Sequence, residues 1–511
     1  MQMKKIIAML LLCVMVLPLA VSCGKDSGKE ALTTDTETAS DTAVAPEEED
    51  PLIDDIEEHV EILAEENKFK GKSFTWIGNG YQAPEKEEEI GDVQSDALYF
   101  RQRDIEELFE IDWSNYIPED LEDKGMDPIA EAVKQDVLAG SGAYDAGYGM
   151  SFTCTALIAS NSLLDMSEFE TMDLDMPWWT QSLRDTYSMA GALYLVNGPI
   201  LTCHYQDAAS VVYNKVVAED YGIDGLYDIV RSGEWTFDKM FEIASLVPEN
   251  GNGSGAYRYG DPDAVSMLIA QGVTITKFDE EGKPYLEDNI DKTIVDIADE
   301  YCRIFGDDTQ TVNTKGSYSG SNYENFEEKY GYESYEEMFA DDKILFLFIP
   351  TDEAAWLRIH EVQFGILPMP KASTAQEDYI SYATPVSAFD VFTPKSTKDA
   401  EVTDVILEAM AALGYKYFKP VFYDTMLKSR MVYDYESKDM IDIIFNTKRH
   451  DMINMFDEGT SINGPGSVVR LLNGAVTENS QGLTSRFFIQ SKVVNGNIRE
   501  ILANLEADRN R

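Results

Sequence analysis

The stretch Ile344-Leu345-Phe346-Leu347-Phe348-Ile349 is the most informative part of the sequence for the fold. Every residue in it is apolar, and Pro350 ends the run, because proline cannot donate a backbone hydrogen bond within a sheet. Uninterrupted apolar runs are typical of strands that are buried on both faces, as in parallel sheets covered by helices. The stretch therefore predicts an inner strand of an α/β protein.

Helical patterns and further strands alternate on both sides of this stretch. Apolar residues recur at helical spacing over residues 402–413, and Gly414 follows as an end signal. Towards the N-terminus, residues 73–77 predict a strand, and Asp127 followed by Pro128 predicts the start of a helix. Strands interleaved with helices predict α/β layers with mostly parallel sheets.

Three short motifs carry a family resemblance. They are residues 211–215 (Val-Val-Tyr-Asn-Lys), 233–238 (Gly-Glu-Trp-Thr-Phe-Asp) and 364–370 (Phe-Gly-Ile-Leu-Pro-Met-Pro). In order and spacing they resemble segments of the extracellular solute-binding proteins of bacterial ABC transporters, in the family 1, maltodextrin-like and sugar-binding superfamily. The general layout extends this resemblance from about Ser73 to Phe456.

The resemblance implies a two-lobe fold of the periplasmic-binding-protein type (type II), with mostly parallel sheets, flanking helices and hinge crossings between the lobes. The length agrees, because about 440 residues exceed what one hydrophobic core holds. We expect lobe 1 to comprise residues 69–204 and 341–383, and lobe 2 to comprise residues 205–340 and 384–511. The hinge crossings are expected near Tyr205 and at residues 382–387.

The resemblance also implies that a solute binds between the lobes, beside loops at the carboxyl ends of strands. Sugars need planar apolar faces for their C–H surfaces and amides or carboxylates for paired hydroxyl groups. Four segments supply both kinds of group, and the predicted ligand contacts are Asn79, Tyr81, Asp145, Tyr148, Tyr205, Asp207, Asp352 and Trp356. For each of these residues, a purely structural role in a loop or the core is an open alternative.

Other aromatic residues are predicted to pack rather than to bind. Thr236 is suited to cap a helix that buries Phe237, which makes the preceding Trp235 a packing residue. Tyr213 and Asn214 end an apolar strand and are expected to fix the backbone there. Trp179 is interpreted mainly as packing near the rim of the cleft, with contact to the ligand as the less favoured alternative.

The N-terminus has the pattern of a lipoprotein signal peptide. Lys4 and Lys5 precede an uncharged, mostly apolar run that ends in Ala20-Val21-Ser22-Cys23. This ending resembles the lipobox of bacterial lipoproteins, which implies cleavage of residues 1–22 and a lipid anchor on Cys23. An ordinary secretory signal is the alternative. Residues 23–68 are predicted to be a disordered acidic tether, within which residues 54–66 can form a short helix.

The composition excludes several classes of function. A formal net charge of −52 disfavours binding to nucleic acid or to an anionic lipid surface. Of the five cysteines, the three at positions 154, 203 and 302 remain beyond Cys23, so they can form at most one disulfide. The four histidines are far apart in the sequence, and no metal site or cofactor is predicted.

No sequence motif for catalysis is present. The Gly-x-Ser-x-Gly, phosphate-binding-loop and His-Glu-x-x-His patterns do not occur. Together with the resemblance and the signal-peptide pattern, this absence predicts a non-catalytic, monomeric, lipid-anchored protein on the extracytoplasmic side of a bacterial cell membrane. The resemblance implies that it captures a solute, with a carbohydrate or oligosaccharide favoured, and delivers it to ABC transporter permease subunits. A cell-surface glycoside hydrolase and a non-transport glycan-binding adhesion module are the alternatives.

Overall fold

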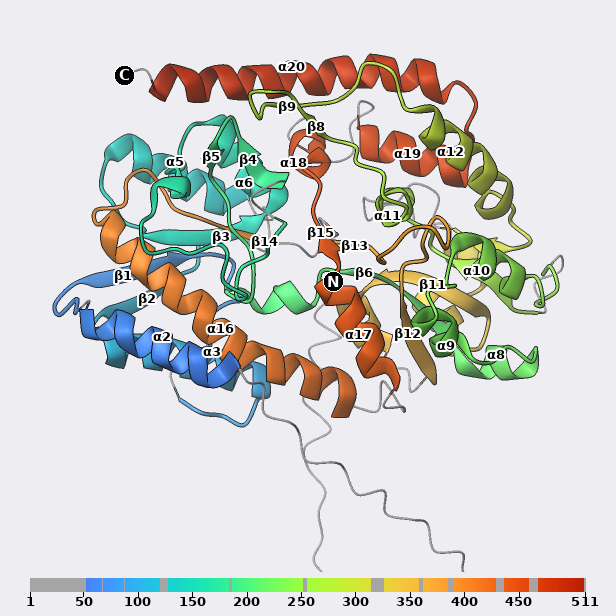
Figure 1. Ribbon diagram of the computed structural model, residues 1–511, viewed down its shortest axis with the longest axis horizontal. Helices are drawn as coiled ribbons and strands as arrows, with labels where there is room; N and C mark the ends of the chain where they lie inside the picture. Colours follow the sequence, from blue (N-terminus) through green and yellow to red (C-terminus); the bar gives the residue numbers. More distant parts are fainter. Residues whose placement is uncertain are drawn as a thin grey trace, which may run out of the picture. The chain divides into compact units, whose positions relative to one another are not determined.

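The fold is known from a computed structural model, and Figure 1 shows its helices and strands. The structure describes residues 52–66, 68–86, 88–119, 127–182, 186–250, 255–313, 326–357, 362–384, 389–428, 436–458 and 467–509. Residues 51–511 form one compact unit. The predicted signal peptide, Cys23 and residues 24–51 of the predicted tether lie outside the described residues.

The first sheet has four strands in the order β14-β3-β1-β2 (Figure 1). Its strands are β1 (Ser73–Ile77), β2 (Asp112–Tyr116), β3 (Ala146–Met150) and β14 (Phe389–Phe392). Strand β1 is parallel to β2 and β3, whereas β14 is antiparallel to β3. The predicted strand at residues 73–77 is confirmed.

The second sheet has five strands in the order β10-β7-β11-β6-β12. Its strands are β6 (Ala209–Asn214), β7 (Tyr257–Gly260), β10 (Thr311–Val312), β11 (Ile344–Pro350) and β12 (Phe364–Pro368). Strand β6 is antiparallel to β11 and β12, while β7 is parallel to β10 and β11. Residues 344–349 of β11 are all buried in the middle of this sheet, as the apolar run predicts.

Helices around the first sheet come from both ends of the chain. They are α2 (Leu52–Glu66), α3 (Val93–Phe109), α5 (Asp127–Ala139), α6 (Ser151–Ala159) and α16 (Ala400–Lys428). The long helix α16 packs against α2 and α3 (Figure 1). The buried face of α2 includes Ile56, Val60 and Leu63, which confirms the predicted amphipathic helix. The predicted disordered tether is corrected at its C-terminal part, because residues 52–66 form this helix and pack against the folded body.

Shorter helices surround the second sheet. They are α8 (Lys215–Asp220), α9 (Leu226–Arg231), α10 (Phe237–Ala244), α11 (Ala264–Ala270), α12 (Lys292–Phe305), α13 (Phe326–Tyr330), α14 (Tyr335–Ala340), α15 (Thr351–Trp356) and α17 (Glu436–Asn446). Side-chain caps begin α8 and α10, and of these two the sequence predicted the one at Thr236. Asn214 accepts hydrogen bonds from Val216 N and Val217 N at the start of α8, and Thr236 accepts one from Lys239 N at the start of α10.

The remaining elements are C-terminal helices and short segments. They are α18 (Ile453–Glu458), α19 (Val468–Thr477), α20 (Leu483–Arg509), the 3₁₀ turns η1 (Met166–Glu168) and η2 (Thr202–Tyr205), and the two-residue strands β4 (Ser188–Met189), β5 (Ala192–Leu193), β8 (Lys277–Phe278), β9 (Pro284–Tyr285), β13 (Ser381–Tyr382) and β15 (Lys448–Arg449). Helix α20 contacts α19, α18 and α6. None of the described helices is both long and apolar enough to span a bilayer.

The strand pairing corrects the predicted grouping of segments into lobes. We expected residues 341–383 to belong with residues 69–204, but β11 and β12 pair with β6 in the second sheet. We expected residues 384–511 to belong to lobe 2, but β14 pairs with β3 in the first sheet and α16 packs on α3. The error arises because strand pairing is a long-range contact that the local pattern of a strand does not encode.

Candidate functional site

The carboxyl ends of the first-sheet strands form one edge of that sheet. The parallel strands β1, β2 and β3 all end there. Because β14 runs in the opposite direction, its first residue, Phe389, lies opposite Met150 at the same edge. In open α/β sheets, ligands bind outside the carboxyl ends of strands. We call this region the first-sheet edge, and it includes residues 78–82, Tyr116, Ile117 and Phe389.

Tyr148 holds the loop that follows β1. Its phenolic oxygen accepts hydrogen bonds from Gly80 N at 3.0 Å and from Gln82 N at 3.1 Å. Gly78 must be glycine here, because a Cβ atom would lie 2.0 Å from the Tyr148 ring. Tyr148 is thus fully buried and positions the loop. The structure gives it this structural contact in place of the predicted contact with a ligand.

The same loop is also fixed from the other side. The Gln82 side chain is buried, donates to Thr202 Oγ1 and accepts from Thr202 N, each at 2.8 Å. Asn79 Oδ1 accepts a hydrogen bond from Tyr81 N at 3.1 Å. These contacts pre-organise the backbone around Tyr81.

Tyr81 is the exposed member of this loop. Its side chain is 66% exposed, and its ring centroid lies 6.3 Å from that of Phe389 in an edge-on arrangement. Tyr116 and Ile117, at the end of β2, are also exposed. Apolar side chains gathered outside the core frequently mark binding surfaces. The first-sheet edge therefore exposes aromatic and aliphatic side chains.

Asp145 lies beside Thr75, in the middle of β1, and not at the edge that carries Tyr81. It immediately precedes β3, and its Oδ2 accepts a hydrogen bond from Thr75 N at 2.8 Å. The glycine-containing residues 146–150 form the strand β3 itself. Its glycines allow close packing, since a Cβ atom on Gly147 would lie 2.4 Å from Ile77 Cγ2.

The corresponding edge of the second sheet carries carboxylates. Asp352 and Glu353 follow β11, and Asp261 follows β7. Tyr335 Oη donates a hydrogen bond to Glu353 at 2.9 Å. Burial and then the neighbouring Asp352 raise the pKa of Glu353 to about 8. We call this region the second-sheet edge. The side chain of Trp356, at the end of α15, lies outside the described part of the chain.

The two predicted hinge crossings lie next to each other. Ala208 and Ala383 form an antiparallel bridge, and Thr384 N donates to Asp207 O at 2.7 Å. Residues 207–208 lead into β6 of the second sheet, while residues 383–384 precede β14 of the first. Residues 385–388, the rest of the predicted second crossing, fall outside the described residues. We call the region around Asp207 and Thr384 the junction.

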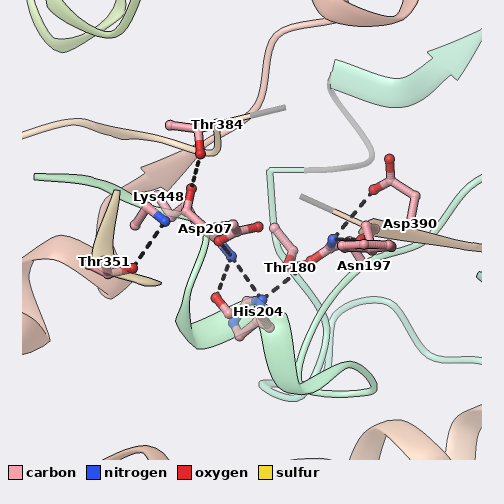
Figure 2. Close-up of polar contacts among 10 residues, drawn as sticks. Thr180, Asn197, His204, Asp207, Thr351, Thr384, Asp390 and Lys448 are labelled. Carbon is pink, nitrogen blue, oxygen red and sulfur yellow. Dashed lines mark hydrogen bonds and ion pairs between the residues drawn. The ribbon is translucent and has the colours of Figure 1, made fainter. Parts of the chain in front are cut away.

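A buried network of polar side chains occupies the junction, as Figure 2 shows. Lys448 Nζ donates to Asp207 Oδ1 and to His204 O, each at 2.8 Å, and lies 3.0 Å from His204 Nδ1. His204 Nδ1 is 3.3 Å from Asn197 Oδ1, and Asn197 Nδ2 donates to Asp390 Oδ1 at 3.4 Å. The network thus runs from Asp207 to Asp390, that is, from the entry of β6 to β14.

Burial controls the charges in this network. It raises the pKa of Asp207 to about 6, despite the opposing effect of Lys448, and it raises the pKa of Asp390 to about 7. Burial and the nearby Lys448 hold the pKa of His204 well below its ordinary value. Asp207 is therefore an internal ion-pair partner in this structure, where its side chain has no exposed surface.

The other aromatic residues singled out in the sequence are core residues. Tyr205 is buried and stacks on Phe422, with ring centroids 5.5 Å apart. Trp235 is fully buried and donates its indole N–H to Pro368 O at 2.9 Å. Trp178 and Trp179 both donate to the buried carboxylate of Glu408, at 2.8 and 2.9 Å. The packing interpretation of Trp235 and Trp179 agrees with these contacts.

Sequence reasoning missed several residues at these sites. Tyr116, Ile117 and Glu353 were detectable, because each directly follows or ends a strand at a carboxyl edge. Asn197, Asp390 and Lys448 gave no local signal, because they come from distant segments.

Cys154, Cys203 and Cys302 are free thiols. Within the described ranges, His, Cys, Asp and Glu side chains do not gather in any group of three that could hold a metal ion.

Comparison with solved structures identifies the fold. The sugar-binding protein MalE from Xanthomonas citri shares 11% sequence identity with this chain and superimposes with a TM-score of 0.53, covering 86% of this chain and all of MalE. M. tuberculosis UspC shares 13% identity with a TM-score of 0.52, covering 83% of this chain and all of UspC. The chain has the two-lobe fold of the periplasmic binding proteins. No protein-family model and no curated protein matches the sequence.

This periplasmic-binding-protein fold is the α/β architecture that the three sequence motifs implied. In it, residues 209–214 form β6, Trp235 directly precedes the cap of α10, and residues 364–368 form β12. All three motifs therefore lie in or beside the second sheet. They specify how that sheet and its helices pack, which explains why they name the fold and not the solute.

Proposed function

We propose that this protein is a non-catalytic solute-binding protein that captures a carbohydrate or oligosaccharide for an ABC importer. The observation that carries the proposal is the fold, which spans the whole length of both solved relatives. One of them is described as a sugar-binding protein, and this supports a sugar as the solute. The two solved relatives are distant in sequence, so the ligand must be argued from this chain's own residues.

The proposed binding site lies between the two carboxyl edges. At the first-sheet edge, exposed Tyr81, Tyr116 and Ile117 offer apolar faces for the C–H surface of a sugar ring. At the second-sheet edge, Asp352 supplies a carboxylate and Glu353, whose pKa is raised to about 8, supplies a carboxylic acid; the oxygens of both can accept hydrogen bonds from hydroxyl groups. Asn79 and Trp356 are retained as proposed contacts, whereas Asp145, Tyr148, Tyr205 and Asp207 support the structure around the site.

The proposal includes a membrane anchor and a transport partner. Cleavage before Cys23 and acylation of its thiol would tether the protein to the extracytoplasmic face of the membrane. The acidic segment before α2 would hold the folded body, as a monomer, clear of the bilayer. Permease subunits of the importer would then receive the solute from the closed form. Replacing Cys23→Ala tests the anchor, since mass spectrometry should then find an unacylated chain that retains residues 1–22.

A thermal-shift screen of the detergent-solubilised full-length protein tests the function. A ligand that binds only the native state must raise the melting temperature. We expect a shift with a mono- or oligosaccharide and none with peptides of matched size. Stabilisation by peptides alone would overturn the sugar assignment. Hydrolysis of the stabilising sugar would overturn the non-catalytic assignment and favour a glycoside hydrolase. If cells that lack the gene take up that sugar as well as wild-type cells do, an adhesion module would be favoured over a transport protein.

A further inference from the structure

The junction network joins the two sheets through buried charged groups. Asp390 belongs to β14 of the first sheet, Asp207 leads into β6 of the second, and Lys448 belongs to β15. The side chains of Asp207 and Lys448 are 0% and 2% exposed, and Asp390 is fully buried. Water therefore does not screen these charges, and their balance matters for the stability of the junction.

The charges in the network do not balance when both carboxylates are ionised. Lys448 contributes one positive charge, and it contacts Asp207 but not Asp390. Among the described residues, Asp390 receives one long hydrogen bond at Oδ1, from Asn197, and its Oδ2, like Oδ2 of Asp207, has no hydrogen-bond partner. Within this part of the chain no cation contacts Asp390, so an ionised Asp390 would be a buried negative charge without a counter-ion beside it. One bound proton would make the whole network neutral.

We propose that Asp390 carries this proton and that the network is a proton-sensitive latch between the two sheets. With the proton bound, the latch is electrically neutral and the junction is tightly held. When the proton is lost, two buried carboxylates share one lysine, and the junction loosens. This inference does not depend on which solute the protein binds.

The surroundings of Asp390 support this assignment. The ionisable groups that face it from neighbouring elements are Tyr187, Cys154 on α6, Cys203 on η2, Asp207 and Lys448. Burial raises the pKa values of Tyr187 and both thiols, so these groups are uncharged. Lys448 is the cation among them, and Asp207 opposes it. Burial accordingly raises the pKa of Asp390 to about 7, the higher of the two aspartates.

The sign of the pH dependence follows from this shift. Between about pH 4 and about pH 7, the folded protein keeps the Asp390 proton while the unfolded chain has already lost it. Unfolding then releases a proton, so the contribution of Asp390 to stability falls as the pH rises through this range and becomes constant above it. Asparagine at position 390 mimics the protonated side chain and has no proton to lose.

Thermal melts of the full-length, detergent-solubilised protein test the latch. The wild type and Asp390→Asn are compared from about pH 5 to about pH 8, with Asp288→Asn as a control that removes an equal charge from an exposed pair. We expect the wild type and the control to lose a few °C relative to Asp390→Asn as the pH rises. Parallel curves for all three proteins would overturn the proposal. A slope that persists in Asp390→Asn but vanishes in Asp207→Asn would place the proton on Asp207 and also overturn it.

Hydrogen exchange of the wild type provides a test that needs no variant. Val391 N donates to Val196 O at 2.8 Å, and Thr384 N donates to Asp207 O, so both amides report on the junction. After correction for intrinsic exchange, their protection should fall as the pH rises towards about 7 and level off above it, while that of Val212, inside the second sheet, stays constant. Equal pH dependence at all three amides would contradict a latch at the junction.

Discussion

The first-sheet edge and the junction each contain a residue that was predicted to contact the ligand, but the two residues differ in burial. At the edge, Tyr81 is 66% exposed on a loop that is already fixed by Tyr148 and Gln82. At the junction, Asp207 is fully buried and paired with Lys448. Both residues follow or precede strands in the positions expected of ligand contacts. An exposed ring is available to a solute, whereas a buried carboxylate needs an ion-pair or hydrogen-bond partner inside the protein.

The comparison also separates what each region contributes to a binding protein. An exposed aromatic residue costs the folded state little, and its removal is felt when ligand binds. A buried ion pair contributes little net stability when intact, but breaking it leaves an uncompensated charge. Substitutions at the junction should therefore change stability, and substitutions at the first-sheet edge should change affinity.

Replacing Lys448→Met should give the largest effect. The substitution keeps an unbranched side chain but removes the ammonium group and leaves Asp207 without its cation. Breaking a buried ion pair in this way costs about 3 to 5 kcal/mol of unfolding free energy. Denaturant unfolding measures the loss. The matched control is Lys492→Met, which breaks an exposed pair with Asp288 and should cost about 0 to 1 kcal/mol. Equal losses in the two variants would remove the basis for treating the junction as a stability element.

The fold shows which parts of the structure the sequence could reveal. The apolar run at residues 344–349 predicted an inner strand correctly, because a strand buried on both faces requires an apolar residue at every position. The cap at Thr236 was also predicted correctly, because it depends on neighbouring residues alone. The sheet to which β11 belongs was predicted wrongly, because pairing with β6 depends on residues far away in the chain.

The candidate site shows the same division. Tyr81 could be placed at a sheet edge because it follows β1 within a few residues. Asp207 was predicted as a ligand contact because it flanks a hinge crossing, and its burial could not be foreseen. The partner that explains this burial, Lys448, is 241 residues away in the sequence. Local pattern therefore locates loops, but it does not tell whether a loop residue faces solvent or the interior.

Replacing Tyr148→Phe should have an intermediate effect. The change removes the oxygen that accepts hydrogen bonds from Gly80 N and Gln82 N while it keeps the ring in the core. Leaving buried amides without an acceptor costs about 1 to 3 kcal/mol, and this loss should appear in thermal or denaturant melts. The control is Tyr116→Phe, at an exposed tyrosine, which should stay within about 0.5 kcal/mol of wild type. A stable Tyr148→Phe protein would mean that this hydroxyl does not hold the loop.

Replacing Tyr81→Ala should have the smallest effect on stability and should act on binding instead. The ring is mostly exposed, so the unfolding free energy should stay within about 0.5 kcal/mol of wild type. Stacking of an aromatic ring is worth about 0.5 to 1.5 kcal/mol, and its loss should weaken binding of the sugar found in the thermal-shift screen by up to about tenfold. Calorimetric titration measures the change, with Leu246→Ala as the control because it removes an exposed apolar side chain from outside the first-sheet edge. If Tyr81→Ala binds the sugar as tightly as the control does, the solute does not stack on the first-sheet edge. The edge and the junction would then differ only in how much their substitutions change stability.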